Sequence, residues 1–461
     1  MKSWIIQKIT YSTTQFSKNT YDQQLLMQFY ATLIPAQSRI LQIGSKNRFL
    51  FAVLHPCYGV GIESNDELLK QAQADSADYR WYKNLTEITP EKFDYIILSR
   101  SIMEATDLQQ LFEQLLPFCT MRTRIVIDWY AKQWQPFFWM TRKKDRQHAL
   151  KNWFFKRDII HFLHLAGFEI ITQGRTTLFP FYIPGISWFF NSVVASLPVI
   201  SWFCLNRWLI MRPYPLSTTS DTTVSVIVPC RNEQGNVENV ARRIPHMGQH
   251  TEIIFIEGNS RDNTVQEIER VIQKYPEKDI KLLLQTGKGK GDAVRLGFQR
   301  AQGEILMILD ADLTVMPEEL PKFYQALMQG KAECANGSRL VYCMEKDAML
   351  FLNFWVNHAF GILISWILGQ PIKDTLCGTK VFYKKNYVLF MQNRSFFGEN
   401  DPFGDFDLLF GAAHLNLKII DIPVRYKSRA YGSSQIGGYF FNGLLLLRMC
   451  WIGYKKFKLR W

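Results

Sequence analysis

The chain has 461 residues, of which 47% are hydrophobic and 21% are charged. Such a chain buries enough apolar surface to fold, which excludes a disordered or fibrous protein, and its length indicates two domains. The net charge of +13 is compatible with three kinds of anionic partner: nucleic acid, a membrane surface and phosphorylated substrates. The first residues contain no apolar run typical of a signal peptide, so we expect a cytosolic protein with free thiols.

Both halves of the chain are predicted to be α/β domains with parallel sheets, because short apolar runs alternate with helical patterns. We expect a first domain at 1–185, an apolar interfacial segment and linker at 186–221, and a second domain at 222–461. The strands expected in the first domain are Arg39–Gly44, Tyr95–Leu98 and Thr123–Ile127. Those expected in the second are Val224–Val228, Ile253–Ile256, Leu282–Leu284 and Ile305–Leu309, with helices at Val237–Ile244, Asp262–Tyr275 and Asp292–Ala301.

Three apolar stretches resemble membrane segments: Ile186–Ile210, Ala348–Leu368 and Phe440–Tyr454. A crossing at either of the first two would separate parts of the protein that must act on one side of the membrane. We therefore favour helices that lie in the membrane interface, with buried core or domain-contact helices as the alternative. The basic tail that follows the third stretch would contact anionic headgroups through Lys455, Lys456, Lys458 and Arg460.

In the first domain, a strand that ends at Gly44 is followed about twenty residues later by a strand that ends at Glu63. This layout is typical of a nucleotide-type cofactor site, in which the turn approaches the ligand and the carboxylate binds ribose hydroxyls. The domain resembles the class I S-adenosylmethionine-dependent methyltransferases, with Gly44 and Glu63 as a vestigial cofactor site. Lys46 and Arg48 stand where that family has further glycines. We therefore favour a degenerate, non-catalytic module over an active methyltransferase or another small-ligand site.

The second domain places polar residues after successive predicted strands. Glu233 and Glu257 follow the first two strands, Lys288 and Lys290 lie in the glycine-rich turn GKGKGDA, and Asp310-Ala311-Asp312 ends the strand ILMIL. Ligands of open α/β sheets bind at this edge, and two carboxylates at one strand end favour a hard divalent cation such as Mg²⁺ or Mn²⁺. The pattern predicts a site for a metal ion and phosphate groups.

Residues 222–440 resemble family 2 glycosyltransferases of the GT-A fold, in particular dolichol-phosphate mannosyltransferases and other polyprenyl-phosphate glycosyltransferases. The matching segments are PCRNE at 229–233, the segment 257–264, DAD at 310–312, GSR at 337–339, DTLCGTKVF at 374–382, FDLL at 406–409 and IPVRYKSRAYGSSQI at 422–436. Together, the resemblances of the two domains imply an α/β fold class with two Rossmann-like domains, the first methyltransferase-like and the second GT-A.

The resemblance also implies roles for individual residues. The base and ribose pocket would contain Pro229, Arg231, Glu233 and Glu257; Asp310 and Asp312 would bind the metal beside Ala311; and Lys288, Arg339 and Arg429 would bind phosphates. This chain departs from the family pattern at Arg231, Gly258 and Gln435, where the family has Tyr, Asp and Lys. These differences affect the expected nucleotide and phosphate contacts.

The expected reaction is inverting transfer of a sugar from a nucleoside-diphosphate sugar to a polyprenyl or dolichyl phosphate, on the cytosolic membrane face, with no nucleic-acid partner. A lipid phosphate is already a nucleophile, whereas a soluble or glycan hydroxyl acceptor would need Asp405 or Asp407 as a base. The alternative reading of Asp405 and Asp407 is a helix N-terminal pair. A bifunctional glycosyltransferase and methyltransferase, or a membrane-bound scaffold, are further alternatives.

Overall fold

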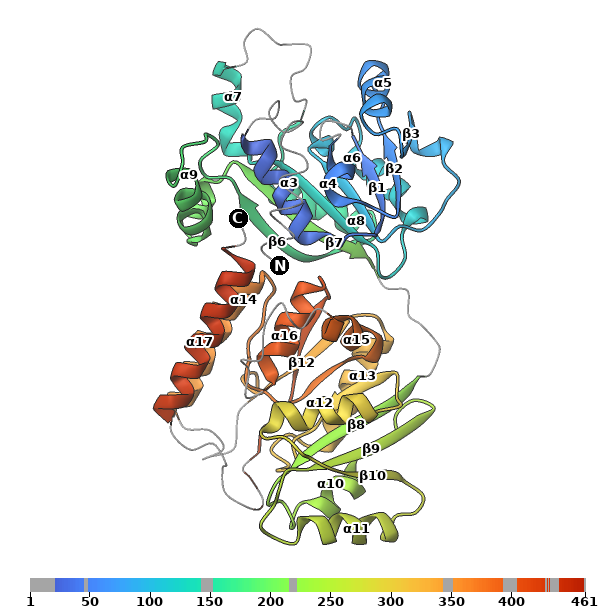
Figure 1. Ribbon diagram of the computed structural model, residues 1–461, viewed down its shortest axis with the longest axis vertical. Coiled ribbons are helices and arrows are strands. Elements are labelled where there is room, and N and C mark those ends of the chain that lie inside the picture. The colour runs from blue at the N-terminus through green and yellow to red at the C-terminus, as the bar shows by residue number, and fades with distance from the viewer. Residues whose placement is uncertain are drawn as a thin grey trace. The chain divides into compact units, whose positions relative to one another are not determined.

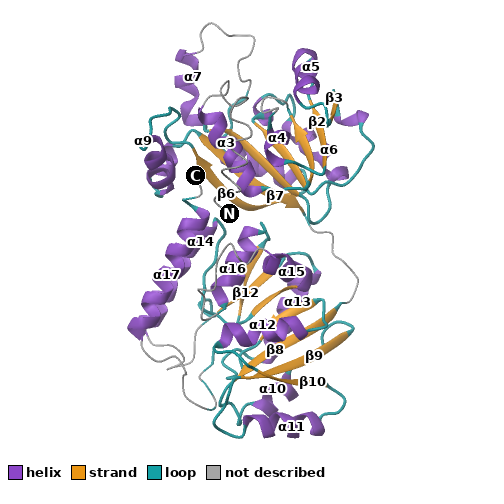
Figure 2. Ribbon diagram, viewed as in Figure 1, coloured by secondary structure: helices purple, strands orange, loops and turns teal. Residues whose placement is uncertain are grey.

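The computed structural model describes residues 21–44, 49–141, 152–214, 222–342, 351–392, 404–427, 429, 431 and 439–459. The chain forms two compact units, one of residues 1–214 with 458–461 and one of residues 215–457. Each unit contains its own seven-stranded sheet with helices packed on it (Figures 1 and 2). Lys46, Arg48, Gln435 and Arg460 lie outside the described residues.

The sheet of the first unit has the strand order β3-β2-β1-β4-β5-β7-β6. Strands β3, β2, β1, β4 and β5 run parallel, whereas β7 is antiparallel to both of its neighbours. The sheet is therefore mixed, and the prediction of a wholly parallel sheet was wrong here. The strands are β1 (Arg39–Ile43), β2 (Tyr58–Ile62), β3 (Arg80–Tyr82), β4 (Tyr95–Ser99), β5 (Arg124–Tyr130), β6 (Phe168–Thr176) and β7 (Asn206–Pro213).

Helices cover both faces of the first sheet, which explains why β4 and β5 are buried along their whole length. Helices α3 (Tyr21–Leu33) and α4 (Leu50–Leu54) contribute to the core on one face. Helices α6 (Leu108–Leu115) and α8 (Lys156–Leu165) contribute to the core on the other face. Helix α5 (Asp66–Asp75) follows β2, and α7 (Gln135–Thr141) follows β5.

The segment 186–221 differs from the expectation of an interfacial helix and linker. Residues 186–203 form short helical turns, α9 (Ile186–Trp188), η6 (Phe189–Val193), η7 (Val194–Ser196) and η8 (Ile200–Phe203). The next residues form β7, which hydrogen-bonds to a strand on each side. An apolar run that enters a sheet satisfies its backbone groups through neighbouring strands, so hydropathy alone did not separate it from a helix.

The sheet of the second unit has the order β10-β9-β8-β11-β13-β12-β14. Strands β8 to β11 are parallel, β13 is antiparallel to β11 and β12, and β14 is parallel to β12. The four predicted strands are confirmed, but this sheet too is mixed. Its strands are β8 (Thr223–Cys230), β9 (His250–Glu257), β10 (Asp279–Leu284), β11 (Ile305–Ile308), β12 (Cys334–Ser338), β13 (Lys380–Tyr383) and β14 (Ile419–Pro423).

The helices of the second unit include two long ones, α14 (Phe351–Leu368) and α17 (Tyr439–Phe457), which lie side by side (Figure 1). The rings of Trp366 and Tyr454 stack between them at 5.6 Å. Among the described residues, no helix combines the length and apolar character needed to cross a bilayer. The other helices are α10 (Val237–Arg243), α11 (Thr264–Lys274), α12 (Lys290–Arg300), α13 (Leu320–Met328), α15 (Lys384–Gln392) and α16 (Asp405–His414).

Candidate active site

The predicted site residues of the second unit gather where β8, β9 and β11 end. These strands are parallel neighbours, so their carboxyl ends meet at one edge of the sheet. The loops after β8 and β9 are joined by hydrogen bonds: the backbone N–H of Asn232 donates to Ser260 Oγ (2.9 Å), and that of Glu233 donates to Thr264 Oγ1 (3.0 Å). Asn232 has a positive φ of 56°, which turns the chain sharply before Glu233.

Arg429 joins two of these loops. Its Nη2 donates to Asp312 Oδ2 at 2.8 Å, and its Nη1 lies 3.4 Å from Glu233 Oε1. Thr314 holds the other oxygen of Asp312 through its backbone N–H (3.1 Å) and its hydroxyl (2.8 Å). Burial raises the pKa of Glu233, although Asn236 and Arg429 act in the opposite direction. The structure therefore brings the predicted residues Glu233, Asp312 and Arg429 together.

Asp310 is paired with Lys290, whose Nζ lies 2.6 Å from Asp310 Oδ1. Burial by itself would raise the pKa of Asp310, but Lys290, followed by Lys380 and Arg339, outweighs burial and lowers it. The same ion pair raises the pKa of Lys290 against its own burial. Asp310 is thus held as a carboxylate. Lys288, singled out from the sequence, has an exposed side chain, and Lys290 from the same turn occupies the position beside the carboxylate.

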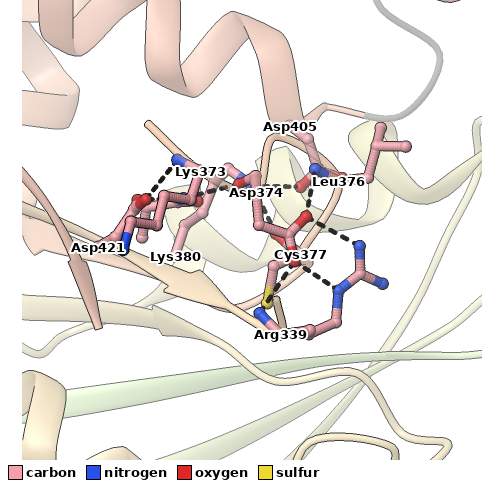
Figure 3. Close-up of polar contacts among 9 residues, drawn as sticks. Arg339, Lys373, Asp374, Leu376, Cys377, Lys380, Asp405 and Asp421 are labelled. Carbon is pink, nitrogen blue, oxygen red and sulfur yellow. Dashed lines mark hydrogen bonds and ion pairs between the residues drawn. The ribbon is translucent and has the colours of Figure 1, made fainter. Parts of the chain in front are cut away.

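Arg339 forms a two-pronged ion pair with the fully buried Asp374 (Figure 3). Its Nε lies 2.7 Å from Asp374 Oδ2, and its Nη2 lies 2.9 Å from Asp374 Oδ1. The backbone N–H of Arg339 donates to the same carboxylate at 3.0 Å. The Arg339 guanidinium also lies 5.1 Å from the ring of Tyr426. The phosphate-binding role of Arg339 stays a prediction. In this structure the guanidinium group of Arg339 binds both carboxylate oxygens of Asp374.

Asp405 and Asp407 both lie in the first turn of α16 and are both buried. Lys380 Nζ lies 3.1 Å from Asp405 Oδ1 and donates to the backbone carbonyl of Cys377 at 2.6 Å (Figure 3). Asp407 lines a small, mostly apolar cavity with Phe390. Because residues two apart on a helix point in different directions, the two carboxylates have different surroundings.

The remaining predicted residues lie at the same sheet edge. Pro229 is near the end of β8 and pairs in register with Ile256, and Glu257 ends β9 with its carboxylate accepting the backbone N–H of Ser260. Ala311 is buried, and Arg231 is exposed in the loop after β8. Their contacts with a nucleotide remain predictions.

The sequence pattern did not assign roles to Asp374 and Lys380. Lys288 and Lys290 both lie in the turn expected to bind phosphate, and spacing alone did not decide which of them lies beside Asp310. Lys380 is fully buried within the strand KVFY, and Asp374 is fully buried beside Arg339. A charged residue in an otherwise apolar segment needs a partner when it is buried, and this is the signal that could have identified Lys380 from the sequence.

The donor set at the end of β11 fits a hard divalent cation. The side chains of Asp310 and Asp312 are 33% and 15% exposed, so neither is sealed off from solvent. Among the residues described, no three His, Cys, Asp or Glu side chains cluster closely enough to form a complete ligand set. Magnesium-type sites commonly combine one or two carboxylates with phosphates of the substrate, and two carboxylates meet that pattern.

In the first unit, Gly44 and Glu63 follow β1 and β2 as predicted. Gly44 has a φ of 86°, and its N–H donates to the carbonyl of Ile62 at 2.8 Å. Glu63 Oε1 accepts the backbone N–H of Asn65 at 2.9 Å. Lys46 and Arg48 follow Gly44 in the sequence and lie outside the described residues, so the S-adenosylmethionine site stays a prediction.

Residues 225–388, which lie entirely in the second unit, match the model of the family Glycosyl transferase family 2. The C-terminal half of the chain therefore contains a family 2 glycosyltransferase domain of α/β architecture with a mixed sheet.

Two curated proteins illustrate its relatives. The dolichol-phosphate mannosyltransferase of Pyrococcus furiosus is 38% identical over 222 residues, which cover 47% of this chain and 59% of that protein. The undecaprenyl-phosphate 4-deoxy-4-formamido-L-arabinose transferase of Edwardsiella ictaluri is 25% identical over 46% of this chain and 63% of that protein. The chain thus spans about three fifths of the length of these relatives.

A solved structure is also similar to the chain at low identity. Glucosyl-3-phosphoglycerate synthase from Mycobacterium tuberculosis, in complex with Mn²⁺, uridine diphosphate and glucosyl-3-phosphoglycerate, has 16% identity and a TM-score of 0.38. The match covers 51% of this chain and 80% of that one.

Proposed function

We propose that the protein is a metal-dependent, inverting glycosyltransferase that moves a sugar from a nucleoside diphosphate to a polyprenyl or dolichyl phosphate at the cytosolic membrane face. The observation that carries the proposal is the end of β11, where Asp310 and Asp312 each pair with a cation at the sheet edge shared with Glu233 and Glu257. The family match and the two relatives named for lipid-phosphate substrates support it.

The charged residues of the site have different proposed roles according to the sign of their charge. Asp310 and Asp312 would hold Mg²⁺ or Mn²⁺, which supplies Lewis-acid stabilisation of the leaving diphosphate. Arg429 and Lys290 place positive charge beside these carboxylates, where negative charge grows on the β-phosphate as the sugar departs. Glu233 in the loop after β8 and Glu257 at the end of β9 lie at the same edge, in a position suited to donor hydroxyls.

Asp405 is already engaged in an ion pair, with Lys380 Nζ 3.1 Å from its Oδ1. A hydroxyl acceptor would need a base such as Asp405 or Asp407 to remove its proton. A lipid phosphate carries its own nucleophilic oxygen and needs no base. In-line attack by that oxygen would invert the anomeric centre.

The test uses the purified full chain with radiolabelled UDP- and GDP-sugars, Mn²⁺ and a membrane lipid extract. We expect label in the organic phase, and Asp312→Asn should lower the transfer rate by about 100-fold, the usual cost of removing one group that stabilises developing charge. Asp279→Asn is the matched control, because Asp279 is an acidic residue outside the site, 2.9 Å from His250. Label confined to water-soluble products would contradict the lipid acceptor.

A further inference from the structure

Two arginines face each other on adjacent strands of the first unit. Arg175 in β6 and Arg207 in β7 are directly opposite in the antiparallel register. Side chains opposite each other in such a pair point to the same face of the sheet, about 5 Å apart at their Cβ atoms, and like charges there destabilise the pair. Both side chains are only partly exposed, so water screens their repulsion incompletely.

A third cation adds to this repulsion. Lys156, the first residue of α8, has its pKa lowered by burial and then by Arg207 and Arg175. Burial, followed by Arg175, likewise lowers the pKa of Arg207. Among the described residues no carboxylate pairs with any of the three, and the one side-chain hydrogen bond of Arg175 goes to Ser201 Oγ at 3.1 Å. A charge conflict of this kind marks a functional site when a ligand resolves it.

Exposed aromatic side chains lie along the chain beside these cations. Trp202 and Phe203 follow Ser201 directly and are 49% and 52% exposed. Their backbone carbonyls accept hydrogen bonds from Gln133 Nε2 (2.6 Å) and Trp134 Nε1 (3.0 Å), which fixes these two residues to the segment after β5. Phe155, which precedes Lys156, is 59% exposed. Aromatic side chains next to cations are typical of surfaces at the lipid headgroup level.

We propose that Lys156, Arg175 and Arg207 form a binding site in the first unit for a phosphate-type anion, and that this anion is the headgroup of a lipid. Guanidinium groups suit phosphate because they bind two oxygens at once, and an anion between them cancels the repulsion described above. The aromatic rim of Phe155, Trp202 and Phe203 provides contacts for the apolar part of a lipid. This site is separate from the sugar-transfer residues and does not depend on the proposed function.

The experiment has two arms, both with the full chain. In the first, the melting temperature is measured with and without inorganic pyrophosphate. In the second, the protein is sedimented with phosphatidylcholine vesicles that contain or lack phosphatidic acid. The variants are Arg207→Gln and Arg175→Gln. Arg157→Gln is the matched control, since it removes the same charge from an exposed neighbour of Lys156.

We expect pyrophosphate to raise the melting temperature of the wild type, and phosphatidic acid to increase vesicle binding. Arg207→Gln should melt higher than the wild type without ligand, because a like charge is gone, and should lose the pyrophosphate shift. The affinity of Arg207→Gln for the vesicles should be about fivefold lower, because each cation near an anionic surface contributes about 1 kcal/mol. The affinity of Arg157→Gln should differ from that of the wild type by less than about twofold. A purely structural arginine would lower the melting temperature when replaced.

The proposal is overturned if neither pyrophosphate nor phosphatidic acid affects the wild type, or if Arg157→Gln loses as much binding as Arg207→Gln. A pyrophosphate shift without any preference for phosphatidic acid supports the anion site and overturns the lipid as its source. A preference for phosphatidic acid that Arg175→Gln and Arg207→Gln both abolish supports both parts.

Discussion

At the scale of single residues, four carboxylates of the candidate active site are each paired with a cation. Asp310 pairs with Lys290, Asp312 with Arg429, Asp374 with Arg339 and Asp405 with Lys380. Such pairs let charged groups stay ionised away from bulk water, where an unpaired charge would be neutralised or expelled. The chain can therefore keep a densely charged site at the edge of a sheet whose core is apolar.

The Arg339–Asp374 pair offers a test of this principle. Asp374→Asn should lower the free energy of unfolding by about 3 kcal/mol, since it leaves the mostly buried Arg339 guanidinium without its counter-charge. The measurement is urea unfolding of the full chain, in which the transition of the second unit gives the free energy of unfolding. The double variant Arg339→Met/Asp374→Leu should recover much of the loss, and equal losses in the single and double variants would argue against a charge effect.

Asp128 of the first unit predicts a dependence on pH. It is fully buried in β5, where burial raises its pKa to about 6 against the opposing effects of Arg100 and Tyr30. The unfolded chain releases this proton near pH 4, so the folded state binds the proton more tightly. The stability contribution is therefore complete below about pH 4 and falls as pH rises through 6.

We expect the unfolding free energy of the wild type to decrease between pH 4 and 6 relative to that of Asp128→Asn, by an amount on the order of 2 kcal/mol. Denaturant titrations of both proteins across this range provide the measurement. Parallel pH profiles for the two proteins would show that Asp128 does not titrate in this window.

At the scale of elements, strand ends and tight approaches of the backbone position the site. The small residues of α14 illustrate the same effect away from it: a Cβ on Gly361 would lie 2.4 Å from the carbonyl oxygen of Lys373, and Ser365 Oγ accepts the N–H of Ile372 at 2.8 Å. Gly361 and Ser365, one helical turn apart on α14, thus pack against the chain that follows the helix.

Gly378 tests how tightly the site is built. A Cβ at this position would lie 2.1 Å from Asp310 Oδ2 and 2.3 Å from Lys290 Nζ, so Gly378→Ala must displace this ion pair. We expect about a 100-fold loss of sugar transfer, the scale of a displacement of about 1 Å in a catalytic site. Gly443→Ala in α17 is the control, because its Cβ would meet no atom within 4 Å. Equal activity of both variants would contradict a role for the Asp310–Lys290 pair.

At the scale of the whole molecule, the chain combines two α/β units that each have a complete sheet and core. Units with separate cores can unfold in separate steps, and a ligand that binds one folded unit stabilises that unit alone. Calorimetry of the full chain should therefore show two transitions. A nucleoside diphosphate with Mn²⁺ should raise the midpoint temperature of one of them. At a ligand concentration of 100 times Kd, binding stabilises that folded unit by about 2.7 kcal/mol.

The control for this prediction is Asp312→Asn, which should keep both transitions and lose the shift. A single transition that moves as one with the nucleotide would indicate that the two units unfold together. The same scan with S-adenosylmethionine tests the first unit, and we expect no shift if that unit is a degenerate module.

The amino-acid sequence by itself determined the α/β class, the predicted strands of both units and the Asp310–Asp312 motif, because apolar runs and strand-end polar residues are local patterns. It did not distinguish β7 from an interfacial helix, since an apolar run satisfies its backbone in either way. Nor did it reveal that Lys290 rather than Lys288 lies beside Asp310, or that Arg175 faces Arg207. Those facts depend on strand register and on loops that meet from distant parts of the chain, so only the tertiary structure decided them.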